Sequence, residues 1–307
     1  MNYTLHQLQV FLKVTEKESI TLAAEEMFLT QPAVSIQLKN FQDQFPIPLT
    51  EVVGRKLFVT DFGQEIAKAA EKILNEVHAI NYKTLTYQGN LSGRLKLSVV
   101  STGKYVMPFF LNGFMRENNG LELIMDVTNK LKVVRALELN KIDFALVSVL
   151  PDNLKIEAVP LLENKLFFVG SGNEVLYKKL TKRQLFETRP LIFREPGSAT
   201  RNAMEDFIAK NKYRSIKKME LTSNEAVKQA VIAGLGYSVM PLIGIKHELK
   251  NKDLRIVDVK GLPINTTWNL VWLSSKKLSP AAHAFLNYIK QEKERIIEDS
   301  FSWIKEY

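Results

Sequence analysis

Three short stretches near the amino terminus show apolar residues at helical spacing. In the first, apolar side chains recur every three or four positions and share one helical face: Leu5, Leu8, Phe11 and Leu12. Ser19 and Thr21 are both suitable amino-terminal caps for a second helix, and Thr30 caps a third that carries Pro32 in its first turn. A tight turn separates the last two, so the pattern predicts a helix-turn-helix.

Two short segments with strand character follow the third helix. Residues 49–53 and 56–60 are rich in apolar and β-branched side chains, and Gly54-Arg55 supplies a turn between them. We therefore expect a β-hairpin wing, and we assign residues 1–60 to a winged helix-turn-helix domain.

A long amphipathic helix is predicted from residue 61 to about residue 88. Its apolar seam repeats at spacings of four and three: Ile66, Ala70, Ile73, Val77, Ile80 and Thr84. At a rise of 1.5 Å per residue this helix is about 40 Å long, too long to bury its seam against one small domain. A partner helix is favoured, with Ile66, Ile73, Val77 and Ile80 as dimerisation residues. The alternative is a helix packed on its own domain, and we assign residues 61–93 to a linker helix and hinge.

Strands alternate with helices from residue 94 to the carboxyl terminus. The expected strands 95–101, 121–127 and 143–150 flank helices 105–117 and 131–140, which predicts an α/β fold with a parallel sheet. A second series of strands and helices begins near residue 166. We expect two subdomains, with the chain crossing near Leu161 and Thr266. Their ranges are 94–161 with 267–307 for subdomain I, and 162–266 for subdomain II.

Composition is that of an ordinary globular protein, with 46% hydrophobic and 24% charged residues among 307. The chain has no cysteine, and its four histidines are scattered, so we expect no metal site and no cofactor. No apolar run reaches the length of a membrane span, and the amino terminus lacks the features of a secretion signal. These features predict a cytoplasmic protein that does not enter a membrane.

The net charge of +9 does not locate a nucleic-acid site. Residues 1–60 hold five Lys/Arg against six Asp/Glu, whereas residues 94–307 hold 34 against 23. The positive excess therefore lies in the α/β region, where it is consistent with an anionic ligand or with solubility alone.

Residues 21–39, TLAAEEMFLTQPAVSIQLK, resemble the amino-terminal signature of the LysR-type transcriptional regulators. The matching positions are Ala23, Ala24, Thr30, Gln31, Pro32, Ala33, Val34 and Ser35. The likeness continues through the wing and Thr60-x-x-Gly63, and through REPGSATR at 194–201 and LGYSVMP at 235–241. With STGKYVMPFFL at 101–111, these segments are most similar to members that sense small anionic metabolites. The resemblance implies a winged helix-turn-helix, a linker helix and a two-subdomain effector domain like periplasmic binding proteins.

Two positions depart from the usual pattern. The family usually has Phe-x-Arg where this chain has Thr50-Glu51-Val52, so a phosphate-facing arginine is missing from the wing. Phe28 occupies the reversing turn where many helix-turn-helix proteins have glycine, so we expect a left-handed backbone there.

The DNA-binding candidates lie on the second and third helices and in the wing. Gln31, Ser35 and Lys39 follow one another at intervals of four and line one face of the third helix, where glutamine can pair with adenine and lysine with guanine or phosphate. Simple solvation is the alternative for any one of them. The remaining candidates are Ser19, Thr21, Thr30, Pro32 and, as a backbone contact in the wing, Arg55.

The effector-binding candidates lie where strands lead into helices. Free backbone amides and hydroxyls at such turns accept anions. One turn contains Ser101, Thr102 and Gly103; the other contains Ser198, Thr200 and Arg201; Ser148 ends a third strand. Isolated hydroxyls are more often helix caps, but two such turns across one cleft favour a ligand site. Nearby Lys104 and Arg194 are further sources of positive charge.

Three functions are consistent with this organisation. The leading hypothesis is a ligand-responsive transcription regulator, whose partners are double-stranded operator DNA, a small anionic metabolite and further copies of itself, as dimer or tetramer. The alternatives are a small-molecule-binding protein or a cleft enzyme, each with an accessory helical domain. No nucleophile–base pair, nucleotide loop or carboxylate dyad is evident in the sequence, so we do not expect an enzyme.

Overall fold

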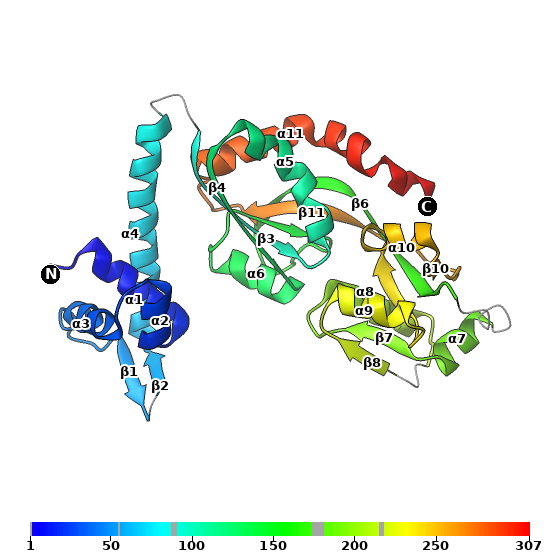
Figure 1. Ribbon diagram of the computed structural model, residues 1–307, viewed down its shortest axis with the longest axis horizontal. Helices are drawn as coiled ribbons and strands as arrows, with labels where there is room; N and C mark the ends of the chain where they lie inside the picture. The colour runs from blue at the N-terminus through cyan, green and yellow to red at the C-terminus, as the bar shows by residue number, and fades with distance from the viewer. Residues whose placement is uncertain (1, 55, 87–90, 174–180, 215–217) are drawn as a thin grey trace. The chain divides into compact units, whose positions relative to one another are not determined.

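The structure is a computed structural model that describes residues 2–54, 56–86, 91–173, 181–214 and 218–307 (Figure 1). The chain divides into two compact units, Met1–Asn90 and Leu91–Tyr307. Among the described residues, no helix has both the length and the apolar composition needed to cross a membrane.

The first unit begins with three helices: α1 (Leu5–Lys17), α2 (Ile20–Glu26) and α3 (Gln31–Gln42). The hydroxyl of Ser19 accepts a hydrogen bond from the Leu22 amide and caps α2. Thr21 lies inside α2, so the expectation that it might serve as the cap is wrong: an amino-terminal cap precedes the helix, as Ser19 does. The hydroxyl of Thr30 caps α3 in the same way, with Pro32 in the first turn as predicted.

The turn between α2 and α3 has the left-handed backbone that the sequence predicted. Phe28 adopts φ 55°, and its ring is 96% exposed. Behind the turn, the three helices pack around a common core whose members include Phe11, Ala23, Val34 and Phe41. The turn therefore sets the angle between α2 and α3 at the cost of an unburied aromatic ring.

The wing and the long helix are joined by close backbone contacts. Strands β1 (Thr50–Val53) and β2 (Lys56–Val59) pair antiparallel, and α4 spans Asp61–Thr86. Thr60 caps α4 by accepting a hydrogen bond from the Gly63 amide at 2.9 Å. A Cβ at Gly63 would lie only 2.0 Å from the Leu49 carbonyl oxygen, so only glycine allows this approach.

The described residues of the second unit contain a seven-stranded mixed sheet in the order β10-β6-β11-β5-β3-β4, with β9 paired to β6. The strands are β3 (Ser92–Val100), β4 (Gly120–Thr128), β5 (Phe144–Val147), β6 (Ile156–Ser171), β9 (Ser238–Pro241), β10 (Leu254–Ile256) and β11 (Ile264–Leu273). Strands β3, β4 and β5 run parallel as predicted, but β6, β9, β10 and β11 pair antiparallel. The prediction of parallel strands is therefore confirmed for β3, β4 and β5, and the antiparallel strands make the whole sheet mixed, because the two crossing strands β6 and β11 run in opposite directions.

Helices cover the sheet in subdomain I. The helical elements are the 3-10 turn η1 (Gly103–Tyr105), α5 (Met107–Glu117), α6 (Lys130–Glu138), α11 (Pro280–Phe301) and the 3-10 turn η4 (Ser302–Glu306). Helices α5 and α11 lie together over one face, and α6 covers the other (Figure 1). The helix predicted over 105–117 is a 3-10 turn followed by α5.

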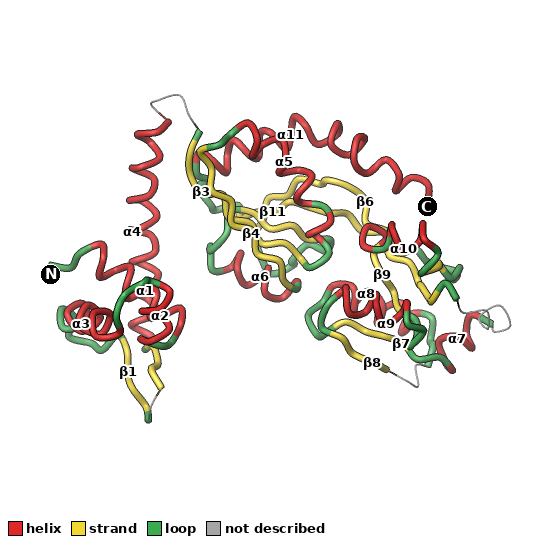
Figure 2. Tube along the Cα trace, in the orientation of Figure 1, coloured by secondary structure: helices red, strands yellow, loops and turns green. Residues whose placement is uncertain are grey.

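Subdomain II is built on a second, smaller sheet of β7 and β8 (Figure 2). Its elements are α7 (Lys182–Thr188), β7 (Leu191–Arg194), α8 (Ala199–Lys210), β8 (Lys218–Leu221), α9 (Asn224–Ile232), the 3-10 turn η3 (Leu242–Gly244) and α10 (Lys246–Asn251). The sequence missed α7, α10 and β10, which are too short to show a clear period.

The two subdomains are joined by one antiparallel ribbon. Strands β6 and β11 pair from Ile156 opposite Leu273 to Leu166 opposite Ile264, with a register shift between Thr267 and Asn269. The expected crossing positions Leu161 and Thr266 both lie in this ribbon. Any change in the arrangement of the subdomains must therefore bend or twist β6 and β11.

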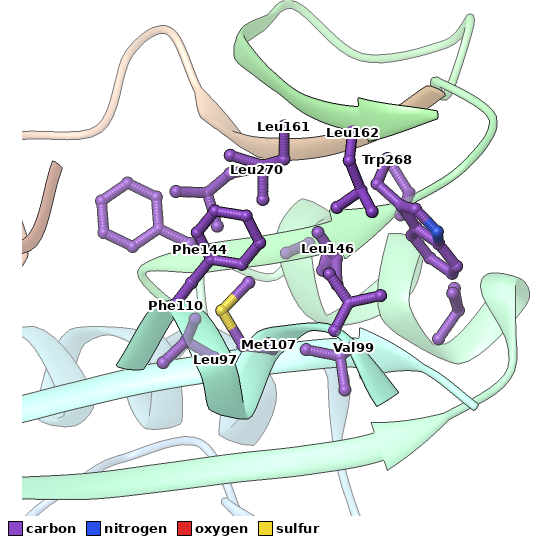
Figure 3. Packing of buried hydrophobic residues seen from close by; sticks show 14 of the residues in the cluster. Leu97, Val99, Met107, Phe110, Phe144, Leu146, Leu161, Leu162, Trp268 and Leu270 are labelled. Atoms are coloured by element: carbon purple, nitrogen blue, oxygen red, sulfur yellow. The ribbon is translucent and has the colours of Figure 1, made fainter. Parts of the chain in front are cut away.

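The largest core fills the space between the main sheet and its helices (Figure 3). Leu97 and Val99 of β3, Phe144 of β5 and Trp268 of β11 are all buried there. Met107 and Phe110 reach the same cluster from α5. This packing holds the carboxyl ends of β3 and β5 in fixed positions, which is where the ligand candidates begin.

Candidate functional site

Helix α3 presents a polar outer face and an apolar inner face. Gln31, Pro32 and Lys39 are exposed, and Ser35 is half-buried. The inner face is buried: Val34, Leu38 and Phe41. Packing therefore fixes α3 to the domain while leaving the candidate side chains free to reach base edges or phosphates.

The other DNA-binding candidates occupy different positions. The hydroxyls of Ser19 and Thr30 accept the capping hydrogen bonds of α2 and α3, which places both at helix amino termini. Thr21 is exposed on the first turn of α2. Arg55 lies outside the described residues.

An exposed isoleucine on α3 was not among the sequence candidates. Ile36 is 57% exposed, between the half-buried Ser35 and Gln37. An apolar side chain on a groove-facing helix is suited to contact a thymine methyl group. The signal was present in the sequence, because Ile36 falls outside the apolar period of Val34, Leu38 and Phe41.

The dimerisation candidates on α4 differ in how deeply the rest of the chain buries them. Ile66 packs against the core of the first unit, and Val77 is half-buried. Ile73 is 40% exposed and Ile80 is 62% exposed. The exposed part of the seam is thus a patch of apolar surface that a second helix can cover.

The strand-to-helix turns of the two subdomains meet at a narrow cleft. Ser101 and Thr102 follow β3 on one wall, and Ser198 and Thr200 begin α8 on the other. Ser148 also lines the cavity. Five candidate residues from three distant segments of the sequence are therefore brought together here. The cavity between them has a volume of about 20 Å³, which is room for one water molecule.

The hydroxyls of the cleft are not used as caps within the described chain. Ser198 precedes α8 but its side chain makes no capping hydrogen bond, and neither does Thr102 before η1. Both residues are buried. The alternative role as helix caps is therefore absent at these two positions, and both residues line the cavity.

Charge and hydrogen-bonding groups in the cleft favour an anion. Lys130 is the charged residue among those described residues that line it, and they include no carboxylate. Asn164 donates to the Thr266 hydroxyl at 2.9 Å, while its buried side-chain oxygen has no hydrogen-bond partner among the described residues. A ligand that carries both a negative group and a hydroxyl would complement this lining.

Two predicted effector residues do not line the cavity. Gly103 is buried against Val99 and Leu146, and a Cβ there would come within 2.9 Å of a Leu146 methyl carbon. Its role in the structure is close packing.

Arg201 is engaged away from the cavity. It donates to the Arg194 carbonyl oxygen at 2.9 Å and pairs with Glu220 and Glu205. The hydrogen bond to Glu220, followed by that to Glu205, raises the pKa of Arg201. These contacts position the β7–α8 turn and leave Arg201 outside the cleft lining.

Sequence reasoning missed four polar residues of the cleft: Asn129, Lys130, Asn164 and Thr266. Asn129 caps α6 directly after β4, so the strand-to-helix argument applied to β4 would have found it and Lys130. Asn164 and Thr266 come from the paired crossing strands, where no local pattern marks a ligand site.

The fold and these two surfaces define a regulator with a DNA-binding domain joined to a ligand-binding domain. The family model for bacterial regulatory helix-turn-helix proteins of the lysR family matches residues 5–64, and that for the LysR substrate binding domain matches residues 88–294. The chain therefore belongs to the LysR family of transcriptional regulators, as its resemblance indicated. The winged helix-turn-helix and two-subdomain α/β fold class are confirmed with it.

Similar proteins match either nearly the whole chain or its α/β unit. The HTH-type transcriptional activator CmpR of Synechocystis sp. is 37% identical over 289 residues, which are 94% of this chain and 95% of that protein. The regulatory domain of CcmR from Synechocystis PCC6803, in complex with 2-PG, is 32% identical with a TM-score of 0.60, and covers 64% of this chain and 96% of that one. Curated relatives are named as transcriptional regulators, not enzymes, which agrees with the sequence prediction.

A full-length structure also shares the fold. CbnR complexed with its target DNA has a TM-score of 0.67 and 17% identity, and covers 94% of this chain and 99% of that one. The likeness spans both units, so each unit shares its fold with the corresponding part of that chain.

Proposed function

We propose that this chain controls transcription by binding double-stranded operator DNA through α3 and by sensing a small anionic metabolite in the cleft of the α/β unit. The anionic class of the ligand is inferred from the residues that line the cleft. They include several hydroxyl groups and Lys130, and no carboxylate of a described residue is among them. An anion is stabilised by such donors and is not repelled there.

The DNA-binding part of the proposal rests on α3 and the residues at its amino end. Gln31, Ser35 and Lys39 read base edges and phosphates, while Ser19, Thr21 and Thr30 lie near the phosphate backbone. Backbone amides at a helix amino terminus attract phosphate independently of sequence. The target DNA bound to CbnR supports the same partner for this chain.

The ligand contacts are assigned to groups on both walls of the cleft. Ser101 and Thr102 hold the ligand from subdomain I, and Ser198 and Thr200 hold it from subdomain II. Ser148 completes the set. The 2-PG bound to the regulatory domain of CcmR supports a small ligand in this class of domain.

Ligand entry requires the cleft to widen. A cavity of about 20 Å³ holds one water molecule and no metabolite. The ligand therefore selects an arrangement of the subdomains that differs from this one, through bending of β6 and β11. Only such a preference for one arrangement allows a ligand to change DNA binding.

Assembly follows from the exposed seam of α4. We assign residues 1–60 to DNA binding, 61–93 to dimerisation and hinge, and 94–307 to effector binding. Ile66, Ile73, Val77 and Ile80 pack against a second α4, and two such dimers join as a tetramer through the α/β units. A dimer places two recognition helices on one operator.

The test of the ligand site is calorimetry with 2-PG on the full chain and two variants. Thr102→Ala and Thr200→Ala each remove one hydroxyl donor, and we expect each to weaken binding about ten- to a hundredfold. Thr267→Ala is the matched control, because Thr267 is exposed on β11 outside the cleft lining. Operator binding without ligand should be unchanged in all three.

The result decides the cleft assignment. If both cleft variants bind 2-PG as tightly as the Thr267→Ala control, these hydroxyls do not contact the ligand. If the parent chain binds none of 2-PG, acetate and inorganic phosphate but does bind glucose, the anionic class is wrong.

A further inference from the structure

A second, larger cavity adjoins the cleft. It has a volume of about 410 Å³ and is lined from both subdomains. We call it the Lys104 groove, and its lining residues include Lys104, Lys132, Arg194, Glu195, Ser223 and Asn224. Of its lining residues, only Ser101 and Asn129 also line the cleft, so its charged side chains are different from those of the cleft.

A hydrogen-bonded wall separates the groove from the cleft. The Ser101 hydroxyl oxygen accepts from Nη2 of Arg194 at 3.1 Å and from Nδ2 of Asn224 at 3.2 Å. Both donors come from subdomain II, and both residues are buried. The two donors use both acceptor sites of the Ser101 hydroxyl, so this wall separates the groove from the cleft in the present arrangement of the subdomains.

One guanidinium nitrogen of Arg194, a residue that lines the groove, has no hydrogen-bond partner among the described residues. The residue is 4% exposed, and its Nε and Nη2 donate to the Glu195 carboxylate at 2.8 and 2.9 Å. Its Nη1 is buried with no hydrogen-bond partner among the described residues. An unpaired buried guanidinium nitrogen is costly, so an acceptor that reached it through a small shift of the groove wall would be stabilised.

The charges of the groove favour an anion. Lys104 and Lys132 are exposed at its mouth and add to Arg194, whereas Glu195 is the carboxylate among its described lining residues and is already paired with Arg194. Lys104 and Lys132 therefore bring positive charge to a space large enough for a phosphorylated metabolite, and Lys104 also interacts with the Glu225 carboxylate, which does not line the groove.

The amino terminus of α9 adds directed donors. Ser223 caps this nine-residue helix by accepting from the Ala226 amide at 3.0 Å, so its hydroxyl proton remains free to donate. Thr128 and Thr222 add hydroxyls from opposite walls. A phosphate group suits this arrangement because its several oxygens can accept from lysine, arginine and hydroxyl donors together.

We propose that the Lys104 groove is a second anion site, which takes a phosphate group through Arg194, Lys104 and Lys132. It is independent of the ligand proposed for the cleft, because its charged residues do not line the cleft. The phosphate is carried either by inorganic phosphate or by a phosphate monoester.

The experiment measures the melting temperature of the full chain as phosphate is raised at constant ionic strength. A ligand that binds only the folded state raises this temperature progressively as its concentration exceeds the dissociation constant. We expect Lys104→Gln/Lys132→Gln to need about tenfold or more phosphate for the same rise. The matched control is Lys141→Gln/Lys155→Gln, which removes two exposed lysines that do not line the groove.

A parallel titration with glycerol 2-phosphate distinguishes a phosphate monoester from inorganic phosphate. The compound that binds more tightly indicates which of the two the groove prefers. The proposal is overturned if, with both probes, the groove variant responds like its charge-matched control. Thr200→Ala, which alters only the cleft, should keep the groove response; failure of the cleft assignment therefore leaves this test intact.

Discussion

We propose that the side chains facing outward from α3 determine which DNA the first unit reads. Gln31 is exposed in the first turn, where an amide can pair with adenine through two hydrogen bonds. Lys39, two turns further along, is a positive charge that suits phosphate or guanine. Specificity should therefore depend on Gln31 more than on any general attraction of the basic α/β unit.

Removal of the Gln31 amide should reduce discrimination between an operator and random DNA. A good bidentate pair contributes about 1–3 kcal/mol of discrimination, so Gln31→Ala should lower the specificity ratio by about five- to a hundredfold. Fluorescence anisotropy with an operator selected from random DNA measures both affinities. Gln9→Ala, an exposed glutamine of α1, is the control. Equal losses on the two DNAs would mean that Gln31 does not read a base.

Sequence reasoning located cleft-lining residues where a local rule applied. Ser101, Thr102, Ser198 and Thr200 follow strands and precede helical turns, and all four line the cleft. Asn164 lies in the middle of a paired strand, where its exposure to a cavity depends on the fold of the whole unit. The contacts of a long side chain such as Arg201 depend on its neighbours in space, which a single sequence does not reveal.

Among the elements, α9 and α10 are joined by a buried charge. Lys228 of α9 is buried and pairs with Glu248 of α10 at 2.7 Å and with the more exposed Glu225 at 3.1 Å. Burial opposes the charged form of Lys228, but the hydrogen bonds to Glu248 and Glu225 outweigh it and raise the pKa of Lys228. The pair therefore stabilises the folded state as long as Lys228 is protonated.

Loss of the Glu248 charge should weaken this link in a pH-dependent way. Glu248→Gln should lower the free energy of unfolding by about 1–3 kcal/mol, and Glu225→Gln, the exposed partner, by less. A pKa raised on folding stabilises below the pKa of the unfolded chain, about 10.4, and this effect is lost as pH rises through the folded value. Urea unfolding should therefore show a constant difference from the parent at pH 7 to 9 that shrinks above pH 10.5. A difference that grows with alkaline pH would contradict the assignment.

One substitution tests whether the exposed apolar seam of helix α4 is the dimer contact. Ile73 is 40% exposed in the single chain, and in a helix pair a lysine there would be buried without a partner. Ile73→Lys should reduce the mass in light scattering from that of the parent oligomer toward that of the monomer. Glu76→Lys introduces the same side chain at an exposed neighbouring position and should keep the parent mass. An Ile73→Lys oligomer of unchanged mass with intact operator binding would place the dimer contact elsewhere.

Elements with a long period or a clear cap were predictable, and short ones were not. The sequence anticipated α1, α3 and α4 because each carries an apolar stripe over several turns. It missed α10, which has six residues, and it identified only the second half of β6. The first half of β6 pairs with β11, and pairing between strands about a hundred residues apart leaves no local signature.

At the scale of the whole chain, function requires communication between a ligand and DNA. The ribbon of β6 and β11 connects the two subdomains. On our proposal, the narrow cleft of about 20 Å³ and a wider one that holds the ligand are two states of this unit. Order of domains and family membership followed from sequence motifs, whereas the narrowness of the cleft depends on how side chains meet across it, which the sequence does not reveal.

Linkage between the two sites tests the central claim most directly. If ligand and operator prefer different arrangements, each must change the affinity of the other by the same factor, typically about five- to 150-fold. The measurement is the 2-PG dissociation constant of the full chain, by calorimetry, with and without saturating selected operator. We predict that the two constants differ by at least about fivefold, and that Thr200→Ala weakens both. Identical constants, with 2-PG bound in each case, would contradict regulation of DNA binding through the cleft.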